Sequence, residues 1–130
     1  MSSNPQRVPK PVNKDRFRRA CGLFATGIAI AGVRDGEGAP HGLTVNSFTS
    51  VSLDPPLVLI CIDHRAGVIG LFRRATTFGL SMLREDQRDL SERFSRKGED
   101  RFDGLRWHTG PGGAPLLSGV LAQMECTVVD

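Results

Sequence analysis

The chain has 130 residues, of which 39% are hydrophobic and 24% are charged, and its formal net charge is +3 at pH 7. This balance fits one globular domain, and the basic excess is too small for a nucleic-acid-binding stripe. No apolar run reaches the ~20 residues that span a bilayer, the first residues lack a signal-peptide core, and the three cysteines have no metal-binding spacing. We therefore expect a cytoplasmic protein with reduced cysteines, without a bound metal and without a membrane or nucleic-acid partner.

The first part of the chain predicts an arm, a helix and a β-hairpin. Residues 1–14 are rich in proline and predict a flexible arm, which leaves residues 15–130 as the single domain. Apolar residues recur at helical spacing over residues 15–24, so a short helix is expected there. Residues 28–33 and 41–46 predict two paired strands, because the Asp-Gly pair between them favours a tight hairpin turn.

The remainder predicts further strands with two helices. Residues 47–52 are extended or irregular, a double proline then forces a turn, and the continuously apolar run at 57–62 predicts a strand buried on both faces. The patterns that follow predict a helix over 66–74, a strand over 76–83, a helix over 86–94 that is ended by Gly98, a loop over 110–113 and a strand over 119–129.

These elements predict a mainly β fold with peripheral helices, arranged as a small antiparallel barrel. The connections are short enough for antiparallel pairing, and no βαβ unit repeats. The last strand ends the sequence, so its edge pairs with earlier strands or is covered by a second copy, unless the chain is a fragment.

Small polar side chains crowd the stretch between the second strand and the double proline. A flavin ring has an edge of alternating hydrogen-bond acceptors and donors, which small hydroxyl and amide groups match without steric bulk. The cluster therefore predicts one wall of a flavin site, and the alternative is that it only shapes a loop. Its members are Thr44, Asn46, Ser47, Thr49, Ser50 and Ser52.

A cationic segment follows the helix predicted over 86–94 and contains two aromatic residues. Arg and Lys side chains there predict a phosphate site, and the alternative is a solvated charged loop. The members are Phe94, Arg96, Lys97, Arg101 and Phe102. Cys61 lies in an apolar run and is expected to be a core thiol, and no residue stands out as a catalytic group.

Several strings of the sequence resemble the flavin reductase family, whose members have the FMN-binding split-barrel fold. The longest is TVNSFTSVSLDPPLV at 44–58, and FATGIAIAG, LSERFSRKGEDRF and GAPLLSG add to it. The resemblance implies a homodimeric split β-barrel that binds FMN or FAD and transfers a hydride to it from NADH or NADPH. It also implies a partner, a flavin-dependent monooxygenase that uses the reduced flavin.

The resemblance further implies which residues bind the flavin. One wall would consist of Thr44, Val45, Asn46 and Ser47 and would continue through Ser50, Val51 and Ser52. Near the ribityl chain and phosphate would lie Cys61, Asp63, His64 and Arg65. The phosphate side would be completed by Phe94, Arg96, Lys97, Arg101 and Phe102. The flavin itself accepts the hydride, so the task of the protein is to position it.

The sequence departs from the family pattern in three places. Val68-Ile69 stands where members often carry a Ser or Thr that reaches the phosphate, and Ser81 stands where Asn is usual. Members also continue past the last strand with further strands and a Gly-Asp-His segment, so we expect a truncated barrel. The alternative function is a flavin-binding split-barrel module without reductase activity, and a third is a plain structural or dimerisation domain.

Overall fold

The computed structural model describes residues 11, 13–23, 27–96, 98 and 100–129. Most of the predicted arm over 1–14 lies outside these residues, so the boundary of the domain stays a prediction. The helices are α1 (Lys14–Gly22), α2 (Ile69–Arg74) and α3 (Arg88–Ser95). The strands are β1 (Ala29–Arg34), β2 (Pro40–Val45), β3 (Thr49–Ser52), β4 (Leu57–Leu59), β5 (Thr77–Met82), β6 (Trp107–Thr109), β7 (Pro115–Leu117) and β8 (Ala122–Thr127).

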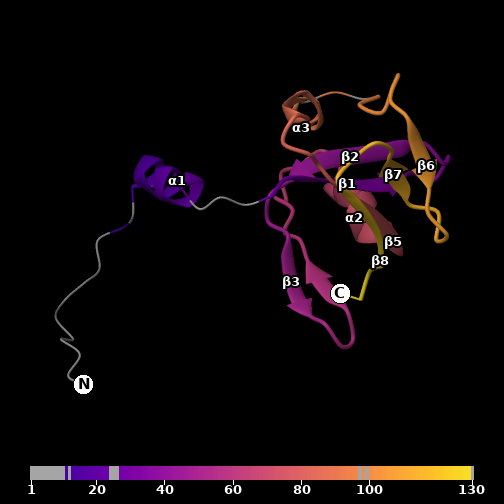
Figure 1. Ribbon diagram of the computed structural model, residues 1–130, viewed down its shortest axis with the longest axis horizontal. Helices are drawn as coiled ribbons and strands as arrows, with labels where there is room; N and C mark the ends of the chain where they lie inside the picture. Colours follow the sequence, from indigo (N-terminus) through magenta and orange to yellow (C-terminus); the bar gives the residue numbers. More distant parts are fainter. Residues whose placement is uncertain (1–10, 12, 24–26, 97, 99, 130) are drawn as a thin grey trace.

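The strands form one four-stranded sheet in the order β2-β1-β5-β8 and two hairpins, β3–β4 and β6–β7 (Figure 1). Every pairing is antiparallel, which confirms the expected mainly β, antiparallel class. The strands of the described ranges do not close into a barrel. The predicted last strand pairs along its whole length with β5 and forms one edge of the four-stranded sheet.

Each face of the four-stranded sheet carries its own apolar cluster. On one face Ala29, Ala31, Val45 and Leu80 are buried, and α2 and the β3–β4 hairpin contribute further side chains to this cluster. On the other face Ile30 packs with side chains from α3 and from the segments before and within β6–β7. The sheet is therefore the middle layer, and the two hairpins lie on opposite faces of it.

A row of three glycines crosses the sheet on the face that β7 covers. Gly42 of β2 is opposite Gly32 of β1, which is opposite Gly79 of β5. A Cβ on Gly32 would come within 3.0 Å of the Pro115 carbonyl oxygen, and a Cβ on Gly42 within 3.2 Å of the Phe102 ring. The absence of side chains in this row lets β7 and the neighbouring aromatic rings approach the sheet backbone.

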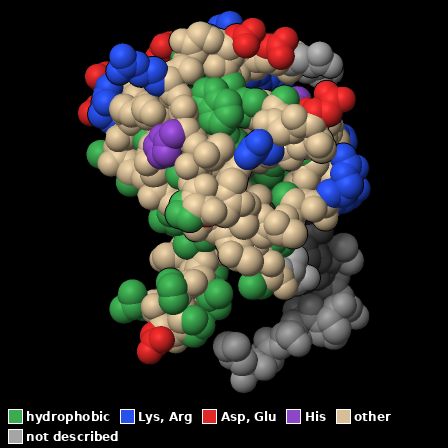
Figure 2. Space-filling view, turned by 90° about the vertical axis from the view of Figure 1, so that its right-hand side faces the viewer, with side chains coloured by type: hydrophobic (Ala, Val, Ile, Leu, Met, Phe, Trp, Pro, Cys, Tyr) green, Lys and Arg blue, Asp and Glu red, His purple; other side chains and the backbone are tan. Residues whose placement is uncertain are grey.

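The strand predicted to be buried on both faces is shorter and more exposed than expected. Only Leu57–Leu59 forms β4, and its burial pattern is exposed, intermediate, exposed. The reason is that β4 pairs with β3 and with no other described strand, so this hairpin leaves part of its apolar surface open. Figure 1 shows the hairpin extending from the body, and Figure 2 shows hydrophobic side chains on a projection at the same level.

The end predicted for one helix needs correction, whereas a predicted loop is found. Helix α3 ends at Ser95 with Arg96 as its C-cap, so Gly98 lies beyond the position that terminates the helix. The loop predicted over 110–113 is confirmed as a turn, and it joins β6 to β7, two strands that the sequence pattern did not reveal. The Glu125 carboxylate of β8 accepts hydrogen bonds from the amides of Gly112 (2.6 Å) and Ala114 (2.9 Å), so this turn already holds an anionic group.

Within the described ranges, no helix is both long and apolar enough to cross a membrane. Helix α1 begins where Asn13 caps it, accepting hydrogen bonds from the amides of Asp15 (2.9 Å) and Arg16 (3.2 Å).

Candidate functional site

The first candidate residues lie where β2 ends. The Thr44 hydroxyl donates a 2.7 Å hydrogen bond to the backbone carbonyl of Ser91 in α3, so it ties the strand to the helix. Val45 is 5% exposed and belongs to the buried cluster, so its side chain anchors the end of β2 in the core. The Asn46 side chain is exposed, with both a donor and an acceptor to offer.

The connection from β2 to β3 is fastened to the chain that leaves β4. The Ser47 hydroxyl accepts a 2.9 Å hydrogen bond from the Cys61 amide and donates a 3.0 Å bond to the Cys61 carbonyl. Two segments that the sequence assigned to the same site are thereby brought together. Cys61 itself is exposed and is not the core thiol that was expected, because it lies between the half-buried Ile60 and Ile62 with its own side chain turned outward.

The β3–β4 hairpin carries the next candidates on a partly open surface. Ser50 and Val51 are exposed and Ser52 is half-buried. The register shifts between Ser50 and Ser52, which marks a β-bulge at Val51. Val51 is 57% exposed and Leu59 of β4 is 52% exposed, so the hairpin offers apolar contact area beside its hydroxyl groups.

Beyond Cys61, the chain turns through Asp63, His64 and Arg65. The Asp63 carboxylate accepts bonds from the Arg65 amide (2.9 Å) and from the Arg65 guanidinium (2.9 and 3.2 Å). These hydrogen bonds lower the pKa of Asp63 from 3.8 to about 2. All three residues are exposed, so Arg65 keeps part of its guanidinium accessible while its position is set by Asp63.

The cationic segment after α3 lies on the other face of the sheet. The rings of Phe94 and Phe102 are buried, edge to face, with centroids 5.0 Å apart. The Arg101 guanidinium donates to the carbonyls of Gly42 (2.7 Å) and Phe94 (3.1 Å), and burial lowers its pKa. These groups hold α3 against β2, on the face of the sheet opposite the β3–β4 hairpin. Arg96 is exposed, and Lys97 lies outside the described residues.

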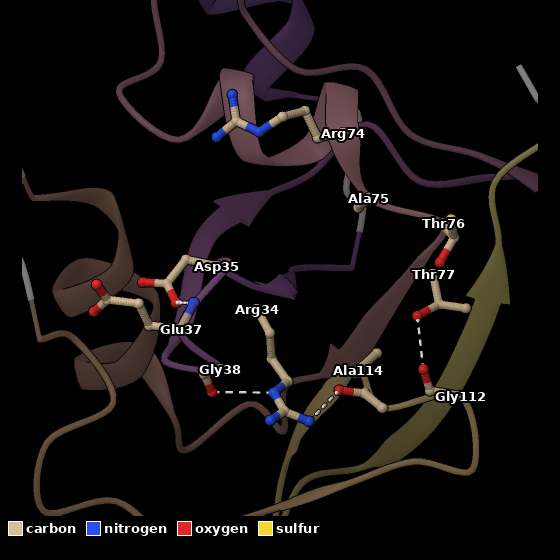
Figure 3. A pocket seen from close by; sticks show the side chains of 12 residues that line it. Arg34, Asp35, Glu37, Gly38, Arg74, Ala75, Thr76, Thr77, Gly112 and Ala114 are labelled. Atoms are coloured by element: carbon tan, nitrogen blue, oxygen red, sulfur yellow. Dashed lines mark hydrogen bonds between the residues drawn. The ribbon is translucent and has the colours of Figure 1, made fainter.

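The polar hollow in Figure 3 contains none of the predicted site residues. It lies at the turn end of the β1–β2 hairpin, the opposite end from Thr44 and Val45. Arg34 donates to the carbonyls of Gly38 (3.0 Å) and Gly113 (3.4 Å), so its guanidinium joins two turns. Figure 3 shows Arg74 extending from α2 without pointing toward Arg34, so the two cations do not converge on one ligand.

Ser91 positions Thr44, and no sequence pattern pointed to this role. Its contribution is a backbone carbonyl, and any residue at that position of α3 would supply one. Phe48 and Ile60 were also missed; they pack against the buried cluster on either side of the Ser47–Cys61 link.

A sequence model of the flavin reductase-like domain matches residues 21–130. The chain belongs to the flavin reductase-like family. It is 43% identical over 114 residues to a probable flavin reductase of Rhizobium meliloti (strain 1021), covering 88% of this chain and 37% of that protein. It is 44% identical over 119 residues to the FMN reductase (NADH) SmoA of Agrobacterium fabrum, covering 92% of this chain and 67% of that protein.

Solved structures agree with this family assignment. The NADH:FAD oxidoreductase SgcE6 of Streptomyces globisporus, solved with NAD and FAD fragments, superposes with a TM-score of 0.85 at 37% identity. The match covers 95% of this chain and 74% of that one. The chain spans 37%, 50% and 63% of the length of three of its curated relatives. The predicted family resemblance is confirmed.

Proposed function

We propose that this chain belongs to an NAD(P)H-dependent flavin reductase, which transfers a hydride from NADH or NADPH to FMN or FAD and supplies the reduced flavin to a partner monooxygenase. The observation that carries the proposal is the surface formed by the β2–β3 connection and the β3–β4 hairpin, fixed to Cys61 through Ser47. Two relatives support it, an NADH-dependent FMN reductase and an NADH-dependent FAD reductase.

The residues present at this surface fit a flavin. Asn46 offers an amide, and Ser50 and Ser52 offer hydroxyl groups, so the donors and acceptors of a flavin edge find partners of both kinds. Val51 and Leu59 offer exposed apolar area on the same hairpin, which suits the face of an aromatic ring. The guanidinium of Arg65, fixed by Asp63, suits a phosphate at the far end of the ligand.

The protein's own residues have positioning roles in this proposal. When bound, the flavin supplies the hydride-accepting chemistry. Thr44 holds the end of β2 against α3, Ser47 holds the connection against Cys61, and Asn46 and Ser50 present polar groups on the backbone that these bonds fix. Asp63 keeps its charge well into the acid range and so holds Arg65 in place.

We also propose the finer fold class, a split β-barrel within residues 15–130 that acts as a cytoplasmic homodimer. An apolar groove between the β3–β4 hairpin and β8 supports the split barrel. It lies between strands of two different sheets, which a barrel would place next to each other. Its lining includes Leu57, Leu59, Phe72, Phe78 and Met124.

The test measures the oxidation of NADH or NADPH in the presence of added FMN or FAD, and the loss of nicotinamide absorbance reports its rate. We expect flavin-dependent oxidation by the wild type and a marked loss of flavin affinity in Asn46→Ala. The matched control is Asn13→Ala, which removes the cap of α1 and leaves the sheet untouched. A protein that binds flavin without oxidising either nucleotide is a binding module, and one that binds no flavin contradicts the proposal.

A further inference from the structure

We infer that Ser47 is a positioning residue of the flavin site, whose hydroxyl clamps the β2–β3 connection to Cys61 and does not donate to the flavin. This inference rests on the proposed flavin-binding function. It differs from the sequence-based assignment, in which the same hydroxyl lines the ring.

The hydrogen-bonding capacity of Ser47 supports the clamp. A serine hydroxyl has a single proton, and that proton is used in the 3.0 Å bond to the Cys61 carbonyl. The oxygen also accepts the Cys61 amide at 2.9 Å. A flavin carbonyl would therefore have to break an existing bond to receive a proton from Ser47, whereas the exposed Asn46 side chain can donate directly.

The position of Ser47 in the strand register explains why it can act in this way. Thr49 is opposite Leu59 at the end of the β3–β4 pairing. Two residues further along each strand, the same antiparallel register places Ser47 opposite Cys61. The strand pairing has ended there, and the side chain of Ser47 supplies the two hydrogen bonds that a partner backbone would otherwise make. The clamp thus extends the hairpin by one further rung.

The two hydrogen bonds of Ser47 fix the relative position of the two segments at the flavin site, and they add little to the stability of the fold. Phe48 and Ile60 anchor the two segments in the apolar cluster, so the fold does not depend on the clamp. Both bonds are solvent-exposed, and water can replace them when the hydroxyl is removed. The segments that carry Asn46 and Cys61 would then no longer be held in register, and the protein would bind flavin more weakly.

The experiment measures FMN affinity by quenching of flavin fluorescence in Ser47→Ala, with Ser118→Ala, at an exposed position directly after β7, as the matched control. We expect the dissociation constant to rise about tenfold in Ser47→Ala, corresponding to the net loss of one or two ordinary hydrogen bonds. Ser118→Ala should bind like the wild type, and Ser47→Thr, which keeps the hydroxyl, should recover most of the affinity.

A second measurement tests the clamp without a ligand. Hydrogen exchange at the Cys61 amide should become faster in Ser47→Ala and stay slow in Ser47→Thr, because only the alanine variant removes the acceptor. If Ser47→Ala does not fold, Ser47→Cys replaces it, since a thiol is a weak acceptor of similar size. The thermal midpoint of each variant separates loss of fold from loss of affinity.

The outcomes distinguish this inference from the proposed function. If the wild type binds neither FMN nor FAD, both are overturned. If the wild type binds flavin and Ser47→Ala binds it equally well, the positioning role alone is overturned. Weaker flavin binding together with faster Cys61 exchange, both reversed in Ser47→Thr, supports the inference.

Discussion

Gly79 occupies the place in β5 where the sheet comes closest to β7, which makes Gly79→Ala a stringent test of the glycine row. A Cβ at this position would overlap the carbonyl oxygen of Pro115 and lie 2.8 Å from Leu116 Cδ2. The obstacle is backbone, so the clash cannot be relieved by a side-chain rotation. Gly79 is also buried between two paired strands, which prevents β5 from moving away.

The expected cost of Gly79→Ala is about 3 kcal/mol of unfolding free energy. Forcing one extra methyl group into a well-packed interior costs roughly 1–3 kcal/mol, and the rigid obstacle places this site at the upper end. Alanine also lowers the entropy of the unfolded chain, which offsets this destabilisation by less than about 1 kcal/mol. For a domain of this length the loss corresponds to a decrease of about 10 °C in Tm.

Urea unfolding followed by circular dichroism measures this difference, with Gly67→Ala as the control. A Cβ on Gly67 meets no atom within 4 Å, so that variant should stay within about 0.5 kcal/mol of the wild type. If Gly79→Ala lost less than about 1 kcal/mol, β7 would not lie on the sheet as described, and the account of the glycine row would be wrong.

Three further predictions concern single side chains. Ser81→Ala should lower the unfolding free energy by about 1–3 kcal/mol, because the buried amide of Leu117 loses its 2.9 Å hydrogen-bond acceptor. Urea unfolding measures this loss, and a value below about 0.5 kcal/mol would contradict the prediction. Asp63, with its pKa lowered to about 2 by hydrogen bonds from Arg65, contributes stability that is present above its usual pKa of 3.8 and is lost as the pH falls toward 2. Carbon-detected NMR titration should show this pKa moving up toward 3.8 in Arg65→Gln, and an unchanged value would exclude the guanidinium as the cause. Burial raises the pKa of Cys126, so alkylation followed by mass spectrometry should modify it more slowly than the two exposed cysteines, and equal rates would show that β8 opens readily.

Local patterns in the sequence determine several elements of this protein. The Asp-Gly turn and its flanking apolar residues predicted the β1–β2 hairpin, because turn chemistry and strand alternation act between neighbours in the chain. The string from Thr44 to Val58 identified the family, and the strand predicted over 119–129 was found as β8.

The tertiary structure alone decides how the candidate side chains are used. Phe94 and Phe102 follow one another in a cationic segment that looks like a ligand site, yet their rings fill the core against the glycine row. The run at 57–62 looks buried, yet β4 has a single neighbour among the strands that the structure describes. Ser47 looks like a flavin ligand, yet its hydroxyl is engaged by Cys61. The exposure and the hydrogen-bond partners of a side chain depend on residues distant in the chain. A local pattern of residue types does not show which distant residues these are.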